Sequence, residues 1–247
     1  MKKILLVLIL CVNLHPKEIT VAVAANVSYA IDELKREFEK NHPGIQVREI
    51  LGSSGKLSAQ IKNGAPYGVF MSADTAYPER LYDEGLGAEK PKTYARGALA
   101  ILSTKKRDMS KKFDIFSESD IRRIAIPNPK TAPYGKAAFQ ALKKSDIYEK
   151  IKKKLVFAES VSQTVAYTVT AADIGIVAKS SLYSPKMSSY KKEVNWTDVN
   201  GSLYKAIDQG ILLLKYGEKD PDYRAFYDFI LSEKAKKIFT RYGYMIP

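Results

Sequence analysis

Cysteine and histidine are almost absent from this 247-residue chain. It contains one cysteine, Cys11, and two histidines, His15 and His42. A single cysteine excludes a disulfide scaffold, and the chain has too few cysteines and histidines for a zinc site. Catalysis by histidine would depend on His15 or His42, and neither stands in a suitable motif. The composition therefore argues against a metalloprotein, and the chain is not expected to be an enzyme.

Long apolar runs are also missing, except for one at the N-terminus. Lys2 and Lys3 precede nine apolar residues, 4–12, which are too few to cross a bilayer as a helix but are typical of a secretory signal peptide. We therefore predict a signal peptide over residues 1–17 and a periplasmic protein. Two alternatives remain: a lipid anchor at Cys11, which bulky Leu10 disfavours, and a buried first strand.

Charge of one sign is in excess. Lysine and arginine number 40 against 27 acidic residues, a net charge of +13. Removing Lys2, Lys3 and Lys17 with the signal peptide lowers it to +10. This charge permits an anionic partner without naming one. The lysines are scattered rather than clustered with aromatic residues, which argues against binding of nucleic acid.

The remainder of the chain alternates short apolar segments with amphipathic ones. With 45% hydrophobic residues the chain can bury a substantial core, and the alternation predicts an α/β fold with parallel sheets covered by helices. The expected strands are 19–23, 47–50, 69–71, 98–102, 124–126, 155–157, 174–177 and 211–214. The expected helices begin near 29, 56, 75, 136, 162 and 221, and the last is expected to run to 239.

Three junctions between a strand and a helix combine small, hydroxyl or amide residues. In open α/β sheets ligands bind beyond the carboxyl ends of strands, where the first N–H groups of helices can hold an oxyanion. Each junction alone also fits an ordinary helix cap or tight turn, and none matches a Walker phosphate loop or a nucleophile elbow. The junctions are Ala24-Ala25-Asn26-Val27-Ser28, Gly52-Ser53-Ser54-Gly55-Lys56 and Ala132-Pro133-Tyr134-Gly135-Lys136.

Together, segments spread along the whole chain resemble a known family. The most specific is Gly64-Ala65-Pro66 followed by Ser72-Ala73-Asp74. The others are Val23-Ala24-Ala25-Asn26, Gly52-Ser53-Ser54-Gly55-Lys56-Leu57, Pro127-Asn128-Pro129 with Pro133-Tyr134-Gly135, Gly175-Ile176-Val177, Ala225-Phe226-Tyr227-Asp228-Phe229 and Arg241-Tyr242-Gly243-Tyr244. By these motifs the chain is similar to the periplasmic molybdate-binding proteins of ABC transporters.

The resemblance implies a two-lobe periplasmic binding protein of type II, with a ligand cleft between its lobes and hinge closure around the ligand. Lobe 1 would comprise residues 18–96 and 207–247, and lobe 2 residues 97–206, with crossings near Arg96 and Ala206. It also implies a monomer that delivers molybdate, and tungstate, to a membrane ABC permease. No cofactor is implied, since molybdenum arrives as an oxyanion rather than as a metal bound by side chains.

Carried over position by position, the resemblance implies four contacts with the oxyanion. They are Asn26, Ser54, Tyr134 and the backbone N–H of Val161. A tyrosine that some members place after the Gly-Ile-Val strand is here Ala178, so Tyr134 is expected to bind through its backbone, its phenol or both.

The four positions carry no charge. Neutral donors can bury a dianion if every oxygen is hydrogen-bonded, and the size of their cavity can favour molybdate and tungstate over sulfate. Another small anion or an organic ligand remains the alternative, although the latter would favour an arginine and more aromatic residues than Tyr134 alone.

Overall fold

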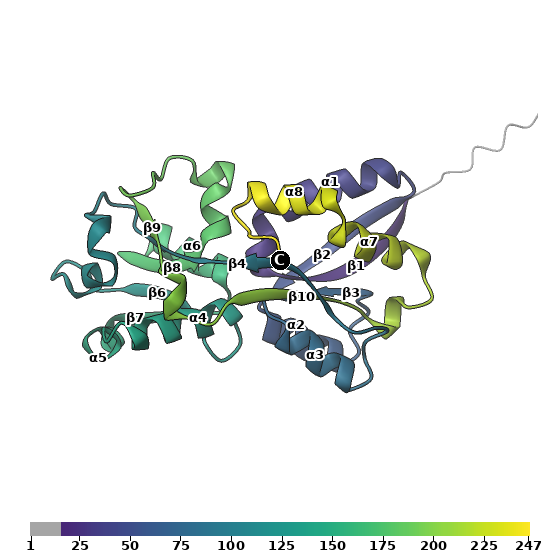
Figure 1. The fold of residues 1–247 in the computed structure, drawn as a ribbon, viewed down its shortest axis with the longest axis horizontal. Helices are drawn as coiled ribbons and strands as arrows, with labels where there is room; N and C mark the ends of the chain where they lie inside the picture. Colours follow the sequence, from purple (N-terminus) through teal and green to yellow (C-terminus); the bar gives the residue numbers. More distant parts are fainter. Residues whose placement is uncertain (1–15) are drawn as a thin grey trace, which may run out of the picture.

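The computed structural model of the chain describes residues 16–247. Cys11 and the apolar run 4–12 lie outside the described residues. Two five-stranded sheets form two lobes that lie side by side, and β4 and β10 run along the middle of the molecule toward the other lobe (Figure 1). No helix within residues 16–247 is long and apolar enough to cross a membrane.

The sheet of lobe 1 has the order β2-β1-β3-β10-β4. Its strands are β1 (Lys17–Ala24), β2 (Ile45–Gly52), β3 (Val69–Met71), β4 (Lys92–Gly97) and β10 (Ile207–Leu213). The first three are parallel, and β10 runs antiparallel to both β3 and β4. This direction follows from the path of the chain, because β4 leads toward lobe 2 and β10 returns from it.

The sheet of lobe 2 has the order β7-β6-β8-β5-β9. Its strands are β5 (Leu99–Leu102), β6 (Ile124–Pro127), β7 (Leu155–Ala158), β8 (Ile174–Ala178) and β9 (Trp196–Asp198). Here β6, β7 and β8 are parallel, whereas β5 is antiparallel to β8 and β9. The expected parallel pairing thus holds within each β-α-β run, and the strands near the crossings make both sheets mixed.

Helices cover both faces of the lobe 1 sheet (Figure 1). One face carries α2 (Ser54–Lys62) and α3 (Ala76–Asp83). The other carries α1 (Ile31–Asn41), α7 (Pro221–Leu231) and α8 (Glu233–Arg241), so the C-terminal helices pack in the lobe that holds β1. The buried side chains between these three helices and the sheet include Ile19, Phe38, Phe226 and Phe239.

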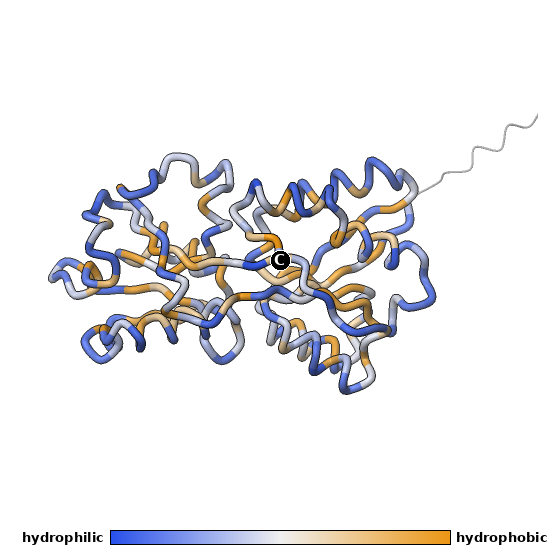
Figure 2. The backbone as a smooth tube through the Cα atoms, in the orientation of Figure 1, coloured by the Kyte–Doolittle hydropathy of each residue, from blue (hydrophilic) through white to orange (hydrophobic). Residues whose placement is uncertain are grey.

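Lobe 2 is built from α4 (Pro133–Lys144), α5 (Tyr148–Ile151) and α6 (Val161–Thr170) around its sheet. Hydrophobic segments concentrate on the strands, and hydrophilic ones on the outer turns (Figure 2). The described residues also include seven 3₁₀ segments: η1 (Ala25–Tyr29), η2 (Met109–Ser117), η3 (Lys152–Lys154), η4 (Lys179–Tyr183), η5 (Pro185–Met187), η6 (Gly201–Leu203) and η7 (Lys215–Gly217).

Several helix boundaries differ from the expectation, and α2 and α4 begin earlier than expected, at Ser54 and Pro133. The first helix does not start near Tyr29, because residues 25–29 form the tighter η1 and α1 begins at Ile31. The helix expected from 221 to 239 is two helices separated at Ser232, whose Oγ accepts a hydrogen bond from the N–H of Ala235 at 3.3 Å. A side chain that caps a new N-terminus in this way ends one helix and starts the next.

Candidate functional site

The carboxyl ends of parallel strands from both lobes meet at one small cavity. In lobe 1, Ala24 at the end of β1 pairs with Gly52 at the end of β2, and in lobe 2, Pro127 of β6 pairs with Ala158 of β7. A small cavity of ≈ 10 Å³ lies between these ends. Its lining residues are Ala24, Ala25, Asn26, Gly52, Ser53, Ser54, Ala73, Ala132, Pro133, Tyr134 and Val161. All four residues named from the sequence are among them.

Lobe 1 presents a side-chain amide and a hydroxyl to this cavity. Asn26 lies in η1, directly after β1, and Ser54 is the first residue of α2. Both are buried, with 1% and 0% of their surface exposed. The Oγ of Ser54 accepts a hydrogen bond from the N–H of Ala73 at 2.9 Å. Because that contact uses a lone pair, the hydroxyl proton of Ser54 remains available to a ligand.

Lobe 2 presents the beginnings of two helices. Tyr134 is the second residue of α4 and Val161 is the first residue of α6. The first N–H groups of a helix have no partner within it and mark the positive end of its dipole. A Cβ on Gly135 would lie 2.4 Å from the carbonyl oxygen of Pro127. Glycine at this position therefore lets α4 begin directly against the end of β6.

The phenol of Tyr134 points to the strands that connect the lobes. Its oxygen accepts a hydrogen bond from the Nε2 of Gln209 at 3.2 Å, and a Cβ on Gly97 would lie 2.0 Å from it. Tyr134 is 1% exposed, and burial raises the pKa of its phenol well above the usual value, so it stays protonated. Tyr134 thus lines the cavity at the start of α4 while its hydroxyl contacts Gln209 of β10.

The two lobes touch across the cavity. The N–H of Gly55 in α2 donates to the carbonyl oxygen of Thr131 in lobe 2 at 3.0 Å. Beside it, Lys56 Nζ lies 2.6 Å from a carboxylate oxygen of Glu159. These contacts hold the helix starts of the two lobes together, so the structure has the geometry of a closed cleft.

The cavity is electrically neutral in its side chains. Its lining residues include no aspartate, glutamate, lysine, arginine or histidine. No group of three potential metal ligands occurs within residues 16–247. What the cavity offers is a set of polar groups at helix N-termini in a water-poor space, an arrangement that suits a buried anion.

Comparison with known proteins agrees with this geometry. The family model of the bacterial extracellular solute-binding proteins matches residues 19–245. The chain belongs to this family. The molybdate-binding protein ModA of Azotobacter vinelandii is 36% identical over 229 residues, which cover 92% of this chain and 89% of the relative. ModA of Rhodobacter capsulatus is 35% identical over 230 residues, with 92% and 88% covered.

A solved structure extends the similarity of this solute-binding protein to three dimensions. The periplasmic molybdate-binding protein of Azotobacter vinelandii superposes with a TM-score of 0.85 at 31% identity, over 93% of this chain and 99% of that one. The two-lobe α/β fold expected from the sequence is confirmed, as is the resemblance to periplasmic molybdate-binding proteins.

Two buried polar residues of this solute-binding protein were not singled out from the sequence. Ser53 is the N-cap residue of α2, but its hydroxyl does not cap the helix; it is buried without a hydrogen-bond partner beside the cavity. Gln209 of β10 is fully buried and contacts both Asn26 and Tyr134. The Gly-Ser-Ser-Gly motif pointed to the region of Ser53, whereas no motif marked Gln209.

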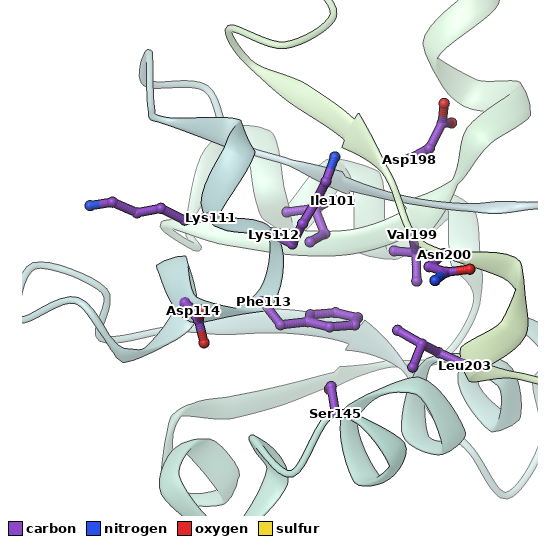
Figure 3. Close-up of a pocket in the computed structure, with 10 residues that line it drawn as sticks. All are labelled: Ile101, Lys111, Lys112, Phe113, Asp114, Ser145, Asp198, Val199, Asn200 and Leu203. Atoms are coloured by element: carbon purple, nitrogen blue, oxygen red, sulfur yellow. The ribbon is translucent and has the colours of Figure 1, made fainter.

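A larger cavity of ≈ 550 Å³ lies elsewhere in lobe 2, and none of the four residues lines it. Phe113 and Leu203 point toward one another across it, and Lys111 points outward (Figure 3). Two of its polar residues already have partners: Lys112 Nζ donates to Thr197 Oγ1 at 2.7 Å, and Asp198 pairs with two lysines. This cavity therefore lacks the converging free donors found between the lobes.

Proposed function

We propose that this protein captures molybdate, and tungstate, in the cavity between its lobes and delivers it to a membrane ABC permease. One observation carries the proposal: Asn26, Ser54, Tyr134 and Val161 come from four separate strand-to-helix junctions and line one neutral cavity. Relatives that are named as molybdate-binding proteins and match almost the whole chain support the same ligand.

A tetrahedral dianion suits this set of groups. Burying its charge costs several kcal/mol unless each oxygen is hydrogen-bonded. Ser54 supplies a hydroxyl, Tyr134 and Val161 supply backbone N–H groups at helix starts, and Asn26 supplies a side-chain amide. Hydrogen bonds to a charged acceptor are about twice as strong as neutral ones. Donors from both lobes on one anion also favour the closed cleft.

The lining residues fit an organic ligand less well. An amino acid or other carboxylate is usually held by an arginine and by aromatic stacking, and the cavity contains no arginine and Tyr134 as its one aromatic residue. The phenol of Tyr134 contacts Gln209, so its ring is held against the hinge. A small inorganic anion is therefore the better match, and cavity size selects among such anions.

We further propose that the protein acts as an exported monomer in the periplasm. The relative of known structure is named as a periplasmic protein. The apolar run 4–12 is typical of a signal peptide. N-terminal sequencing of the native protein tests the export, and an intact Met1 would contradict it. Static light scattering at micromolar concentration tests the monomer.

Metal analysis after dialysis tests the ligand and its site together. The purified protein is incubated with molybdate, dialysed and analysed for molybdenum, and we expect one molybdenum atom per chain. Ser54→Ala removes one donor to a charged oxygen, so its affinity is expected to fall by about 10- to 150-fold, or about 1.5–3 kcal/mol. Equal molybdenum content and equal affinity in both proteins would remove Ser54 from the site.

A further inference from the structure

Gln209 sits at the centre of a buried polar network behind the cavity. Its Oε1 accepts hydrogen bonds from Asn26 Nδ2 at 2.8 Å and from the phenol of Tyr94 at 2.7 Å, and its Nε2 donates to the phenol of Tyr134. The pairing of β10 with β4 shifts register between Gln209 and Gly210. Such a bulge re-aims a side chain, and here it accompanies a glutamine that contacts residues of both lobes.

The network leaves Asn26 with the wrong atom free for an anion. Its Nδ2 donates to Gln209 and, at 3.0 Å, to the phenol of Tyr244. Both amide protons are therefore used, while its Oδ1 is buried without a partner. Asn26 lines the cavity, and its one polar side-chain atom without a partner is Oδ1. This oxygen is an acceptor, and an acceptor repels an oxyanion.

Exchanging the nitrogen and oxygen positions of both amides gives a second arrangement that satisfies the same groups. Asn26 Oδ1 then accepts from Gln209 Nε2 and from Tyr244, and Gln209 Oε1 accepts from Tyr134. Tyr94 then donates to the carbonyl oxygen of Ser72, which lies 3.3 Å from its phenol. In the first arrangement the phenol of Tyr244 donates to the backbone carbonyl oxygen of Asn26 at 2.8 Å. Ser180 Oγ also donates to that carbonyl oxygen, at 3.3 Å, so the carbonyl keeps a partner when Tyr244 turns away.

The three phenols make this exchange possible. A phenol can donate or accept a hydrogen bond, unlike a lysine or an ionised carboxylate. Burial raises the pKa values of Tyr94, Tyr134 and Tyr244 above their usual value, so all three keep their protons. In the exchanged arrangement the free atom of Asn26 is Nδ2, which can donate to an anion.

We propose that Gln209 is a positioning residue: its amide inverts together with that of Asn26 when the anion binds, so that Asn26 presents its N–H to the ligand. The proposal rests on the proposed function, because it assumes an oxyanion in the cavity. Tyr134 belongs to lobe 2 and Gln209 to the returning strand of lobe 1. The network that turns Asn26 is therefore completed only when the lobes close, which links donor orientation to closure.

A double-mutant cycle separates positioning from packing. Gln209→Met keeps the side-chain length but cannot donate and accepts only weakly through its sulfur, and Asn26→Ser removes the amide on which Gln209 acts. By calorimetric titration with molybdate, we expect Gln209→Met to weaken binding by about 10- to 150-fold in the native background. In the Asn26→Ser background the same change is expected to alter the affinity by less than about 2-fold.

Equal losses in the two backgrounds would overturn the proposal, since they would mean that Gln209 acts through hinge packing rather than through Asn26. No loss in the native background would overturn it as well. A wild-type protein that does not bind molybdate would instead contradict the proposed function, so the two failures are distinguishable.

Gln209→Glu provides a second variant if Gln209→Met does not show a cooperative thermal melt. At alkaline pH, where the buried carboxyl group is ionised, it can only accept, so it holds Asn26 Nδ2 away from the cavity. We expect a loss of molybdate affinity that is larger in the native background than in the Asn26→Ser background, where only charge repulsion remains. The same loss in both backgrounds would show that repulsion alone acts and would overturn the proposal.

Discussion

The two adjacent serines at the start of α2 differ in what their hydroxyls contact. Ser54 Oγ accepts the N–H of Ala73, whereas Ser53 Oγ is buried without a hydrogen-bond partner. A buried hydroxyl without a partner costs folding free energy, and a ligand that accepts its proton recovers that cost. Ser53 is therefore a candidate donor to the anion next to Ser54.

Ser53→Ala tests this role. The unfolding free energy is expected to stay unchanged or to rise by up to about 1 kcal/mol, because an unsatisfied group is removed. Molybdate affinity is expected to fall by about 10- to 150-fold, as for a lost bond to a charged oxygen. Ser58→Ala is the matched control, since Ser58 is also buried on α2 but does not line the cavity. Equal affinities for the two variants would exclude Ser53 as a donor.

Tyr134→Phe addresses the phenol that contacts Gln209 rather than the ligand. The change keeps the ring and the backbone N–H and removes one neutral hydrogen bond, so we expect affinity to fall by about 2- to 13-fold. The affinities for molybdate and for tungstate should fall by similar factors, because the lost hydrogen bond does not involve the anion. A loss as large as that of Ser54→Ala, measured by the same titration, would show instead that the phenol donates directly to the anion.

The residues that line the candidate site were partly predictable from the sequence. Helix-start chemistry and family motifs pointed to Asn26, Ser54, Tyr134 and Val161, and these line one cavity; their contacts with an anion remain a prediction. Which of two neighbouring serines has a free hydroxyl depends on rotamers and on the N–H of Ala73, which a sequence does not display. Gln209 was missed because its place follows from a bulge between two strands more than 100 residues apart.

Among the elements, β4 and β10 lie where the chain passes between the lobes. Gly97 ends β4 beside the phenol of Tyr134, and a Cβ there would lie 2.0 Å from that oxygen and 2.8 Å from Gln209 Nε2. Both neighbours are buried, so neither can move without loss of packing. The closed arrangement of the lobes therefore needs a residue without a side chain at position 97.

Gly97→Ala is expected to destabilise the protein by about 1–3 kcal/mol, as overpacking does in a core, and to weaken molybdate binding because closure is opposed. Gly201→Ala is the control, since nothing lies within 4 Å of a Cβ at that position. Thermal melts and titrations compare the two variants. A Gly97→Ala protein with the melting temperature and affinity of the control would rule out the close contact at the hinge.

Element boundaries show where sequence patterns lose information. Apolar runs located the parallel strands β1, β3, β6 and β8 well, because buried strands are continuous hydrophobic segments. β4 and β9 were not expected, since Lys92–Gly97 and Trp196–Asp198 are short and partly polar. Each of these strands pairs with an antiparallel strand far along the chain. The hydrophobic pattern of the local sequence does not reveal such pairing.

For the whole molecule, closure joins two lobes that each hold half of the site. Lys56 and Glu159 pair across the cleft, but their side chains are about half exposed, at 54% and 51%. A surface pair of this kind contributes little, about 0–1 kcal/mol. An anion bound by donors of both lobes, as proposed, would therefore supply most of the preference for the closed state.

Calorimetric titration of the purified protein with molybdate, tungstate, sulfate and a mixture of amino acids tests directly whether the cavity between the lobes is a molybdate site. We expect saturable binding of one molybdate per chain, similar binding of tungstate, weaker binding of sulfate and no binding of amino acids. Binding of an amino acid, or sulfate bound as tightly as molybdate, would contradict a neutral cavity built for a large tetrahedral oxyanion.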